Sequence, residues 1–238
     1  MKVFEPSIRW ILVLMAMALF SSCSHLPVIN HVDPAAAPDT KERCLRPFLD
    51  VPYRFIHSLE VSFPGGRTGT LLGVTVVYPA EKTIHSVIMT IEGFLLFDAR
   101  YDKEVRVNRA VPPFNAEQFA GHMMEDVRLM FLAPEGKLVD AGVYTDGSSV
   151  CRYYGNKDTI VDVSIHKDES WEIKAYSSSH DLLRKIRAFD VQTGIPGMVE
   201  LSGFGFREYS LRLNLISAEA VSPEANHMRP AKTPEDDE

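Results

Sequence analysis

Alternation of apolar and polar residues with a period of two runs through this chain, and it limits the fold to one built mainly of β-strands. From Tyr53 to Phe63, Tyr53, Phe55, Leu59, Val61 and Phe63 share one parity while polar residues dominate the other, as in a strand with one buried face. Pro64-Gly65-Gly66 then predicts a turn. Further strands are predicted at 71–78, 84–92, 94–101, 105–109, 150–154, 159–165, 171–176, 182–191, 198–204 and 209–216.

Two helical segments are expected between these strands. Asn115 is a suitable N-cap for a helix from Ala116 to about Leu132. Within it, apolar residues recur at spacings of four, four and three and form one stripe: Phe119, Met123, Val127 and Met130. Pro134 limits this helix, and a second, shorter helix is predicted from Gly136 to Val143.

The apolar helical stripe gives the sheet a natural cover. Many short antiparallel strands need closure or a covering layer to protect their edges and inner face. The predicted fold is therefore mainly β with a helical insert (α+β), a curved antiparallel sheet wrapped over an apolar helix. Two interpretations of its interior stay open, a packed core or a ligand cavity. The residues concerned are Phe55, Leu59, Val61, Phe63, Phe119, Met123, Val127 and Met130.

The N-terminus has the features of an export signal. Lys2 and Arg9 precede an unbroken apolar run of 11 residues, 10–20, whereas a transmembrane helix needs about 20. Ser21-Ser22-Cys23 resembles the bacterial lipobox, which implies cleavage before Cys23 and acylation of that cysteine. The alternative is an ordinary secretory signal with an incidental cysteine. By resemblance to enterobacterial sorting, Ser24 favours the outer membrane of a Gram-negative bacterium, with the domain anchored by lipid and facing the periplasm.

Proline-rich segments flank the strands and suggest the domain boundaries. Residues 1–22 are the predicted signal peptide, and 23–52 are a lipidated cysteine followed by a Pro/Ala-rich tether. Residues 53–216 form the predicted domain, and 217–238 are a predicted disordered acidic tail.

Composition and motifs exclude several functions. A net charge of −7 without a long basic run argues against nucleic-acid binding. The sequence has no HExxH, CxxC, GxSxG or phosphate-loop motif, and its histidines lack metal-ligand spacing. We therefore predict no enzyme activity, no metal and no cofactor.

The remaining reactive residues have structural explanations. Ser177-Ser178-Ser179-His180-Asp181 is consecutive, so its side chains cannot converge as a triad. Cys44 and Cys151 are the two cysteines besides Cys23, and in an exported protein they either pair or remain separate. Pairing with His166 as a thiol–imidazole couple is the less favoured role of Cys151. His57, on the inward parity, is expected in the core.

Three sequence stretches resemble the LolA/LolB superfamily of lipoprotein carriers, most closely its uncharacterised LolB-like bacterial lipoproteins. They are Thr90-Ile91-Glu92-Gly93-Phe94-Leu95-Leu96-Phe97, Val111-Pro112-Pro113-Phe114 leading into Met124-Glu125-Asp126-Val127-Arg128-Leu129, and Tyr209-Ser210-Leu211-Arg212-Leu213. The resemblance spans roughly residues 53–216. It implies an unclosed antiparallel β-barrel of about eleven strands, covered by one or two helices.

Two functional hypotheses follow. In the first, an outer-membrane-anchored lipoprotein binds acyl chains of lipids or lipoproteins in its half-barrel cavity, as a carrier or acceptor, with a periplasmic carrier protein as a candidate partner. In the second, the same fold is fully packed and acts as an interaction lipoprotein in an assembly that exports glycolipids or polyene lipids. A cavity distinguishes them. A third hypothesis, a lipid hydrolase or thioesterase, lacks a recognisable site.

Overall fold

A single antiparallel sheet of thirteen strands organises the described chain, in the order β1-β7-β8-β9-β10-β11-β12-β13-β2-β3-β4-β5-β6. The computed structural model describes residues 25–32, 37–63, 67–116, 118–155, 158–205 and 208–222. The predicted signal peptide, Cys23 and residues 223–238 of the predicted tail lie outside this part. The strands are β1 (Asn30–His31), β2 (Tyr53–Phe63), β3 (Arg67–Tyr78), β4 (Thr83–Met89), β5 (Leu95–Asp102), β6 (Glu104–Ala110), β7 (Gly136–Val143), β8 (Ser149–Gly155), β9 (Ile160–Ile165), β10 (Trp171–Tyr176), β11 (Leu182–Gln192), β12 (Ile195–Gly203) and β13 (Tyr209–Ala220).

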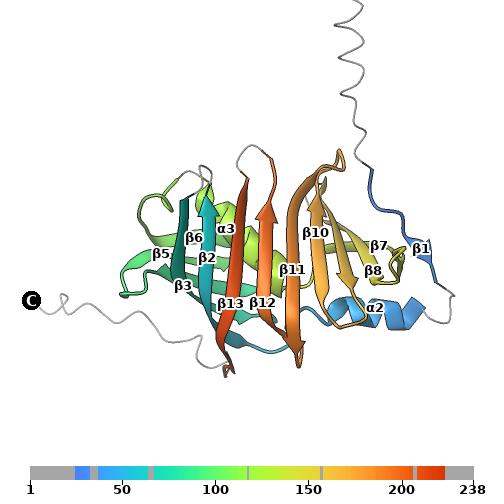
Figure 1. The fold of residues 1–238 in the computed structure, drawn as a ribbon, viewed down its shortest axis with the longest axis horizontal. Helices are drawn as coiled ribbons and strands as arrows, with labels where there is room; N and C mark the ends of the chain where they lie inside the picture. Colours follow the sequence, from blue (N-terminus) through green and yellow to red (C-terminus); the bar gives the residue numbers. More distant parts are fainter. Residues whose placement is uncertain are drawn as a thin grey trace, which may run out of the picture.

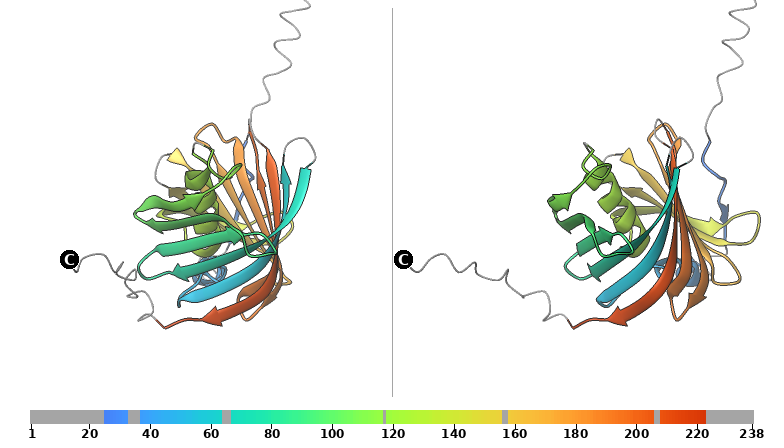
Figure 2. Two further views of the ribbon diagram at one scale, coloured as in Figure 1. Left: turned by 90° about the vertical axis from the view of Figure 1, so that its left-hand side faces the viewer. Right: turned by 60° about the vertical axis from the view of Figure 1, so that its left-hand side comes forward.

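The sheet is strongly curved and does not close. β1 and β6 stand at its two ends and are not hydrogen-bonded to each other. Two helices, α2 (Ala37–Leu45) and α3 (Phe119–Phe131), accompany it. Figure 1 looks onto the outer face, with α3 behind the sheet, and Figure 2 shows the strands curving around α3. The predicted class, an unclosed antiparallel barrel covered by helices, is confirmed. In the described part of the chain, neither helix has the length and apolar composition needed to cross a bilayer.

The segment from Gly136 to Val143 was predicted as a helix, and this prediction is wrong. It forms β7, which pairs with β8 from Gly136↔Gly155 to Val143↔Ser149. A bulge between Leu138 and Asp140 shifts the pairing register, so the apolar residues do not alternate regularly. Only glycine fits at position 136, because a Cβ there would lie 2.1 Å from the Tyr154 carbonyl oxygen.

The start of α3 also differs from the prediction. Asn115 does not cap the helix, and instead lies in a series of turns in which the Phe114 amide donates to the Val111 carbonyl. The helix begins at Phe119, after Gln118, whose φ of 64° is in the left-handed region. The tertiary placement of these turns thus delays the helix by three residues relative to Ala116.

Both ends of the predicted domain extend further than expected. The segment assigned to a tether contributes β1 and α2, and α2 buries Thr40 and Cys44. Cys44 is joined to Cys151 of β8 in a disulfide, with 6.1 Å between the Cα atoms. At the other end, β13 continues to Ala220, beyond residue 216. The fold therefore includes residues that composition alone assigned to linkers.

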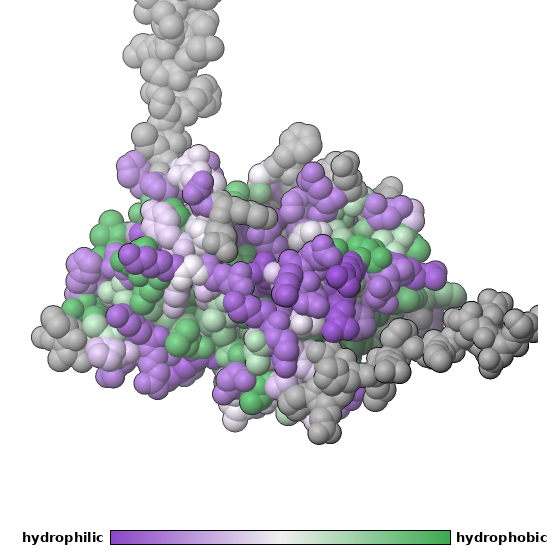
Figure 3. Space-filling model, turned by 180° about the vertical axis from the view of Figure 1, so that it is seen from behind, coloured by the Kyte–Doolittle hydropathy of each residue, from purple (hydrophilic) through white to green (hydrophobic). Residues whose placement is uncertain are grey.

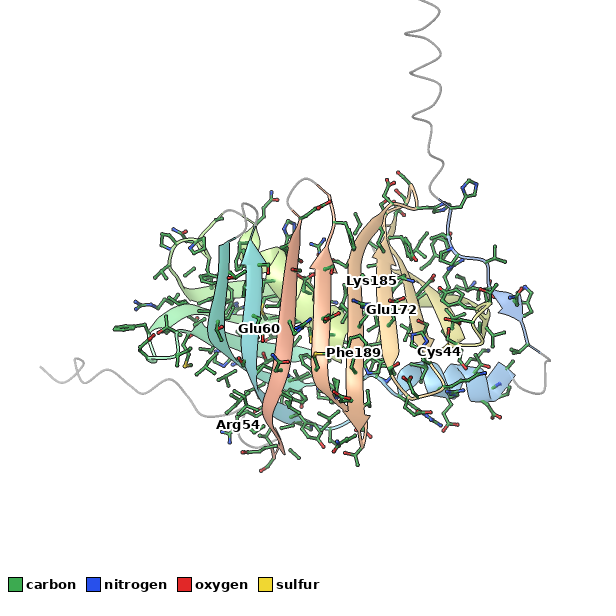
Figure 4. All side chains as sticks on the ribbon, viewed as in Figure 1. Cys44, Arg54, Glu60, Glu172, Lys185 and Phe189 are labelled. Carbon is green, nitrogen blue, oxygen red and sulfur yellow. A yellow bond between two sulfur atoms is a disulfide. The ribbon has the colours of Figure 1, made fainter. Side chains whose placement is uncertain are left out.

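The two faces of the sheet differ in chemistry. The inner face and the helices enclose the core, where the Phe55 ring stacks on Phe131 at 4.8 Å between centroids. Seen from the helix side, the surface mixes hydrophilic and hydrophobic residues (Figure 3). The outer face carries ion pairs between strands, as Figure 4 shows for Glu172 and Lys185, whose charged atoms are 3.0 Å apart.

Candidate functional site

The predicted cavity-lining residues gather in one cluster beneath α3. Phe55, Leu59 and Met130 are buried in the core. The half-buried members pack against it, namely Val61, Phe119, Met123 and Val127. The side chain of Phe63 lies outside the described residues. The structure therefore brings seven of the eight together.

Close aromatic packing fills much of the space under α3. The Phe119 ring meets Phe97 edge-on at 5.9 Å and Phe114 at 5.4 Å between centroids. With Phe55 of β2 stacked on Phe131, aromatic contacts hold α3 against β2 and β5, which lie in the same half of the sheet. In this conformation the predicted lining residues behave as a core.

An open groove lies instead at the α2 end of the inner face. Its volume is about 670 Å³, within the range of about 300–1,000 Å³ typical of small-molecule sites. We call it the α2 groove. It is lined by residues 45–50, 193–195, Glu42, Tyr53, Ile165, Glu169, Trp171 and Val191.

The wall of the α2 groove is held by contacts between distant parts of the chain. After α2 the chain turns, with the Phe48 amide donating to the Leu45 carbonyl, and the Leu49 amide then donates to the Phe131 carbonyl at the end of α3. Arg46 pairs with Glu169 of the β9–β10 turn at 3.0 Å. With the Cys44–Cys151 disulfide, these contacts fix α2 beside the ends of β9 and β10.

The α2 groove combines an apolar floor with charges at its mouth. Ile165 and Trp171 are buried, and Trp171 is only 3% exposed. Arg46 and Glu169 are about half exposed. The indole Nε1–H of Trp171 is buried and has no hydrogen-bond partner among the described residues. Such an arrangement suits a long apolar group with a polar end.

Sequence reasoning missed the α2 groove because much of its wall was assigned to the tether. A signal was present, since Leu45, Phe48 and Leu49 are large apolar residues within a segment otherwise expected to be solvated. Their partners Ile165, Trp171 and Ile195 come from strands far along the chain. Only the fold brings these residues together.

A buried polar cluster joins α3 to the sheet. Asp126 of α3 accepts a hydrogen bond from Arg184 Nε of β11 at 2.7 Å and another from the Tyr209 hydroxyl of β13. Burial raises the pKa of Asp126, because loss of water outweighs the opposing influence of the Arg184 charge and the Tyr209 hydroxyl. The cluster bridges three elements and positions α3 over the sheet.

The other residues considered for chemistry have structural roles. Cys151 is in the disulfide, so it offers no thiol to His166. Ser177 Oγ accepts the amide hydrogens of Ser179 and Asp181 and thereby shapes the β10–β11 turn. In the described ranges, no group of three or more His, Cys, Asp or Glu residues is arranged to hold a metal ion.

Comparison with known proteins supports the fold. No protein-family model matches the sequence. No curated protein matches it either. Among solved structures, a LolA superfamily protein from Nitrosomonas europaea is similar, with a TM-score of 0.52, 11% sequence identity, and coverage of 81% of this chain and 97% of that chain.

Two further solved structures align with lower TM-scores. A domain from Vibrio parahaemolyticus described as an outer membrane lipoprotein-sorting protein has a TM-score of 0.45, 11% identity, and coverage of 80% of this chain and 94% of its own. A DUF1329 family protein from Desulfovibrio piger has a TM-score of 0.42, 13% identity, and coverage of 81% and 95%. The Nitrosomonas structure shows that this chain has a LolA-like fold, as the sequence motifs predicted.

Proposed function

We propose that this protein is an outer-membrane lipoprotein, anchored through Cys23 after removal of residues 1–22, that binds acyl chains of lipids or lipoproteins in its half-barrel. The observation that carries the proposal is the α2 groove, an open site of about 670 Å³ at the end of a LolA-like sheet, with Ile165 and Trp171 buried in its floor. Binding is reversible and involves no covalent step.

The binding energy comes from burial of methylene groups. Each buried methylene contributes about 0.8 kcal/mol, so about eight of them supply about 6 kcal/mol before the costs of association. In the α2 groove, the buried Ile165 and Trp171 face the acyl chain of the ligand. Arg46, Glu42 and Glu169 surround the mouth, where the polar end of the ligand stays in contact with water.

Native mass spectrometry tests the proposal. The chain from Ser24 to Glu238 is expressed in the periplasm as a soluble protein and weighed intact, then weighed again after denaturation. We expect co-purifying lipid, and recovery of bound mass when stripped protein is incubated with phospholipid or a triacylated peptide. An apo mass that stays unchanged after both incubations would overturn the proposal and leave the packed interaction protein as the better hypothesis.

Matched variants locate the site. Leu45 lines the α2 groove and is 51% exposed, whereas Ile216 on β13 is 58% exposed and is not among its lining residues. Because both side chains are about half exposed, a charge at either position leaves the packing of the core intact. Leu45→Glu is expected to lower lipid occupancy at least about tenfold, the equivalent of about 1.4 kcal/mol, and Ile216→Glu to leave it unchanged. If Met123→Glu lowers lipid occupancy and Leu45→Glu does not, the ligand binds under α3 instead.

A further inference from the structure

The chain is already docked on the sheet four residues after the proposed anchor. Arg152 Nη2 donates a hydrogen bond to the Pro27 carbonyl at 2.9 Å. Arg152 itself is fixed, because its Nε and Nη2 each donate to a carboxylate oxygen of Asp162 at 2.7 Å. Asp162 also accepts the Tyr144 hydroxyl at 2.7 Å. Pro27 is thus attached to a rigid polar cluster.

The residues after Pro27 continue this attachment. Asn30 and His31 form β1 and pair with Val143 and Gly142 of β7, and Ile29 is buried. At Gly142 a Cβ would lie 2.2 Å from the Asn30 carbonyl oxygen and 2.7 Å from Ile29 Cγ2. Glycine at position 142 permits this close approach, so β7 can pair with β1 here. We call residues 27–31 the docking strap.

The docking strap begins against the outer face of the sheet, at Pro27, and ends as the edge strand β1 beside β7. Cys151 points inward, since it is bonded to α2, and side chains alternate along a strand, so the adjacent Arg152 points outward. The whole of β9 is buried, including the outward Asp162. A strand buried on both sides is covered on both sides, which agrees with the start of the docking strap lying over this part of the outer face.

The α2 groove lies on the other side. It is formed by inward residues and α2, at the edge that carries the β11–β12 turn. Figure 1 shows the described chain beginning at the upper edge, beside the β10–β11 turn, with α2 at the lower edge, and both views of Figure 2 agree. β11 has 11 residues, so these two edges are about 35 Å apart.

Chain length limits how far the sheet can move from the membrane. An extended chain spans at most about 3.5 Å per residue, so the four steps from Cys23 to Pro27 reach about 14 Å. A free tether as far as Pro52 would reach about 100 Å by the same measure. The docking strap therefore removes most of the freedom that the proline-rich segment suggested.

We propose that the docking strap holds the upper edge and outer face of the sheet against the lipid bilayer that carries the anchor, so that the α2 groove opens away from this bilayer. The inference rests on the anchor at Cys23 in the proposed function and deepens it. An acyl chain then enters from the aqueous side and does not enter laterally from the anchoring bilayer.

Fluorescence quenching in vesicles tests this orientation. The mature lipoprotein is reconstituted in phosphatidylethanolamine and phosphatidylglycerol vesicles that contain a lipid with a spin-labelled headgroup. A fluorophore is attached at Ser178→Cys in the β10–β11 turn or at Thr193→Cys in the β11–β12 turn, both exposed. Because the sites are separated by about 35 Å, quenching at 178 is expected to be at least about twofold stronger than at 193. Equal quenching would overturn the proposal.

Two insertions of the same length distinguish the effect of the docking strap from that of the anchor alone. About 20 Gly/Ser residues between Ser24 and His25 lengthen the chain before the docking strap, and are expected to equalise quenching at the two sites. The same insertion between Val32 and Asp33 lengthens the chain behind it and is expected to preserve the difference. If the second insertion equalises quenching as the first does, the docking strap does not hold the domain.

The outcomes also separate this inference from the proposed function. If the mature protein does not float with the vesicles, the anchor is refuted and the orientation with it. Acyl binding by the soluble chain is measured independently by native mass spectrometry, and neither insertion touches the α2 groove. Acyl binding with equal quenching would therefore refute the orientation alone.

Discussion

His57 is a buried base inside the sheet, and its burial makes stability depend on pH. Its ring lies 5.8 Å from that of Phe55, and desolvation lowers its pKa from 6.5 to about 4. The folded protein thus keeps a neutral imidazole where the unfolded chain takes up a proton. The stability that the folded protein gains from its neutral His57 is complete above pH 6.5, and it is lost as the pH falls from there to about 4.

Replacing His57 should remove this dependence. Each pKa unit corresponds to about 1.4 kcal/mol, so between pH 7.5 and pH 5 the native protein is expected to lose about 2 kcal/mol of unfolding free energy through His57. Urea unfolding of His57→Leu at the two values should show a loss smaller by this amount. His122→Leu, on the exposed side of α3, is the control. An unchanged pH dependence in His57→Leu would contradict the assignment.

The Asp126 cluster makes a second prediction at the residue scale. Arg184→Met leaves the Asp126 carboxylate buried without its cation, and should lower the unfolding free energy by about 3–5 kcal/mol. The double variant Asp126→Leu/Arg184→Met removes both charges and should recover much of this loss.

A neighbouring arginine provides the matched control. Arg187 on the same strand is about half exposed and pairs with Glu200, so Arg187→Met should cost no more than about 1 kcal/mol in urea unfolding. If Arg184→Met costs no more than Arg187→Met, the buried cluster does not stabilise the attachment of α3.

At the scale of the elements, α2 depends on one covalent link. The disulfide joins Cys44 to Cys151 across a sequence separation of 107 residues. Arg43 adds a hydrogen bond from Nη2 to the His166 carbonyl at 3.3 Å. The helix has only nine residues, too few to be stable alone in water. Its position beside the α2 groove therefore follows from these tertiary links.

Removing the disulfide should loosen α2 before the sheet. In the chain-entropy model, a closed loop of about 100 residues contributes about 4.7 kcal/mol, so Cys44→Ser/Cys151→Ser should lower the unfolding free energy by about 4 kcal/mol. Hydrogen exchange should quicken in α2 more than in α3, which serves as the internal control. Equal protection of α2 in native and variant protein would contradict its dependence on the link.

The whole molecule keeps an open edge at β6. This strand is largely exposed, and it pairs on one side only, with β5. Polar side chains occupy it, among them Arg106, which pairs with Glu104 at 3.1 Å. Charges on an edge strand disfavour pairing with a second chain. These charges therefore act against edge-to-edge pairing of the open barrel.

Apolar replacement of this edge should cause association. Arg106→Val/Asn108→Val is expected to convert a substantial fraction of the protein to dimers or larger species in light scattering after size exclusion. Arg54→Val/Glu219→Val makes an equal change on the central strands β2 and β13, whose neighbours are already paired, and should leave the mass unchanged. Association of both variants alike would indicate general hydrophobicity and not edge pairing.

Local patterns in the sequence determined most of the sheet and the helical cover. The period-two alternation from Tyr53 to Phe63 fixes which side of β2 is buried, since the side-chain period of a strand is two. The stripe through Phe119, Met123, Val127 and Met130 likewise fixes the inner face of α3. These features depend on neighbours within one element, so the fold class and the side of each element that faces the core were predictable.

Only the tertiary structure decided the features that depend on distant residues. The bulge in β7 breaks the alternation that identifies a strand, and pairing with β8 supplies the backbone partners that make it one. The Leu49 amide finds its acceptor at Phe131, and Cys44 finds Cys151. The α2 groove and the docking strap exist only through such contacts, because closure of the chain, not local pattern, brings their walls together.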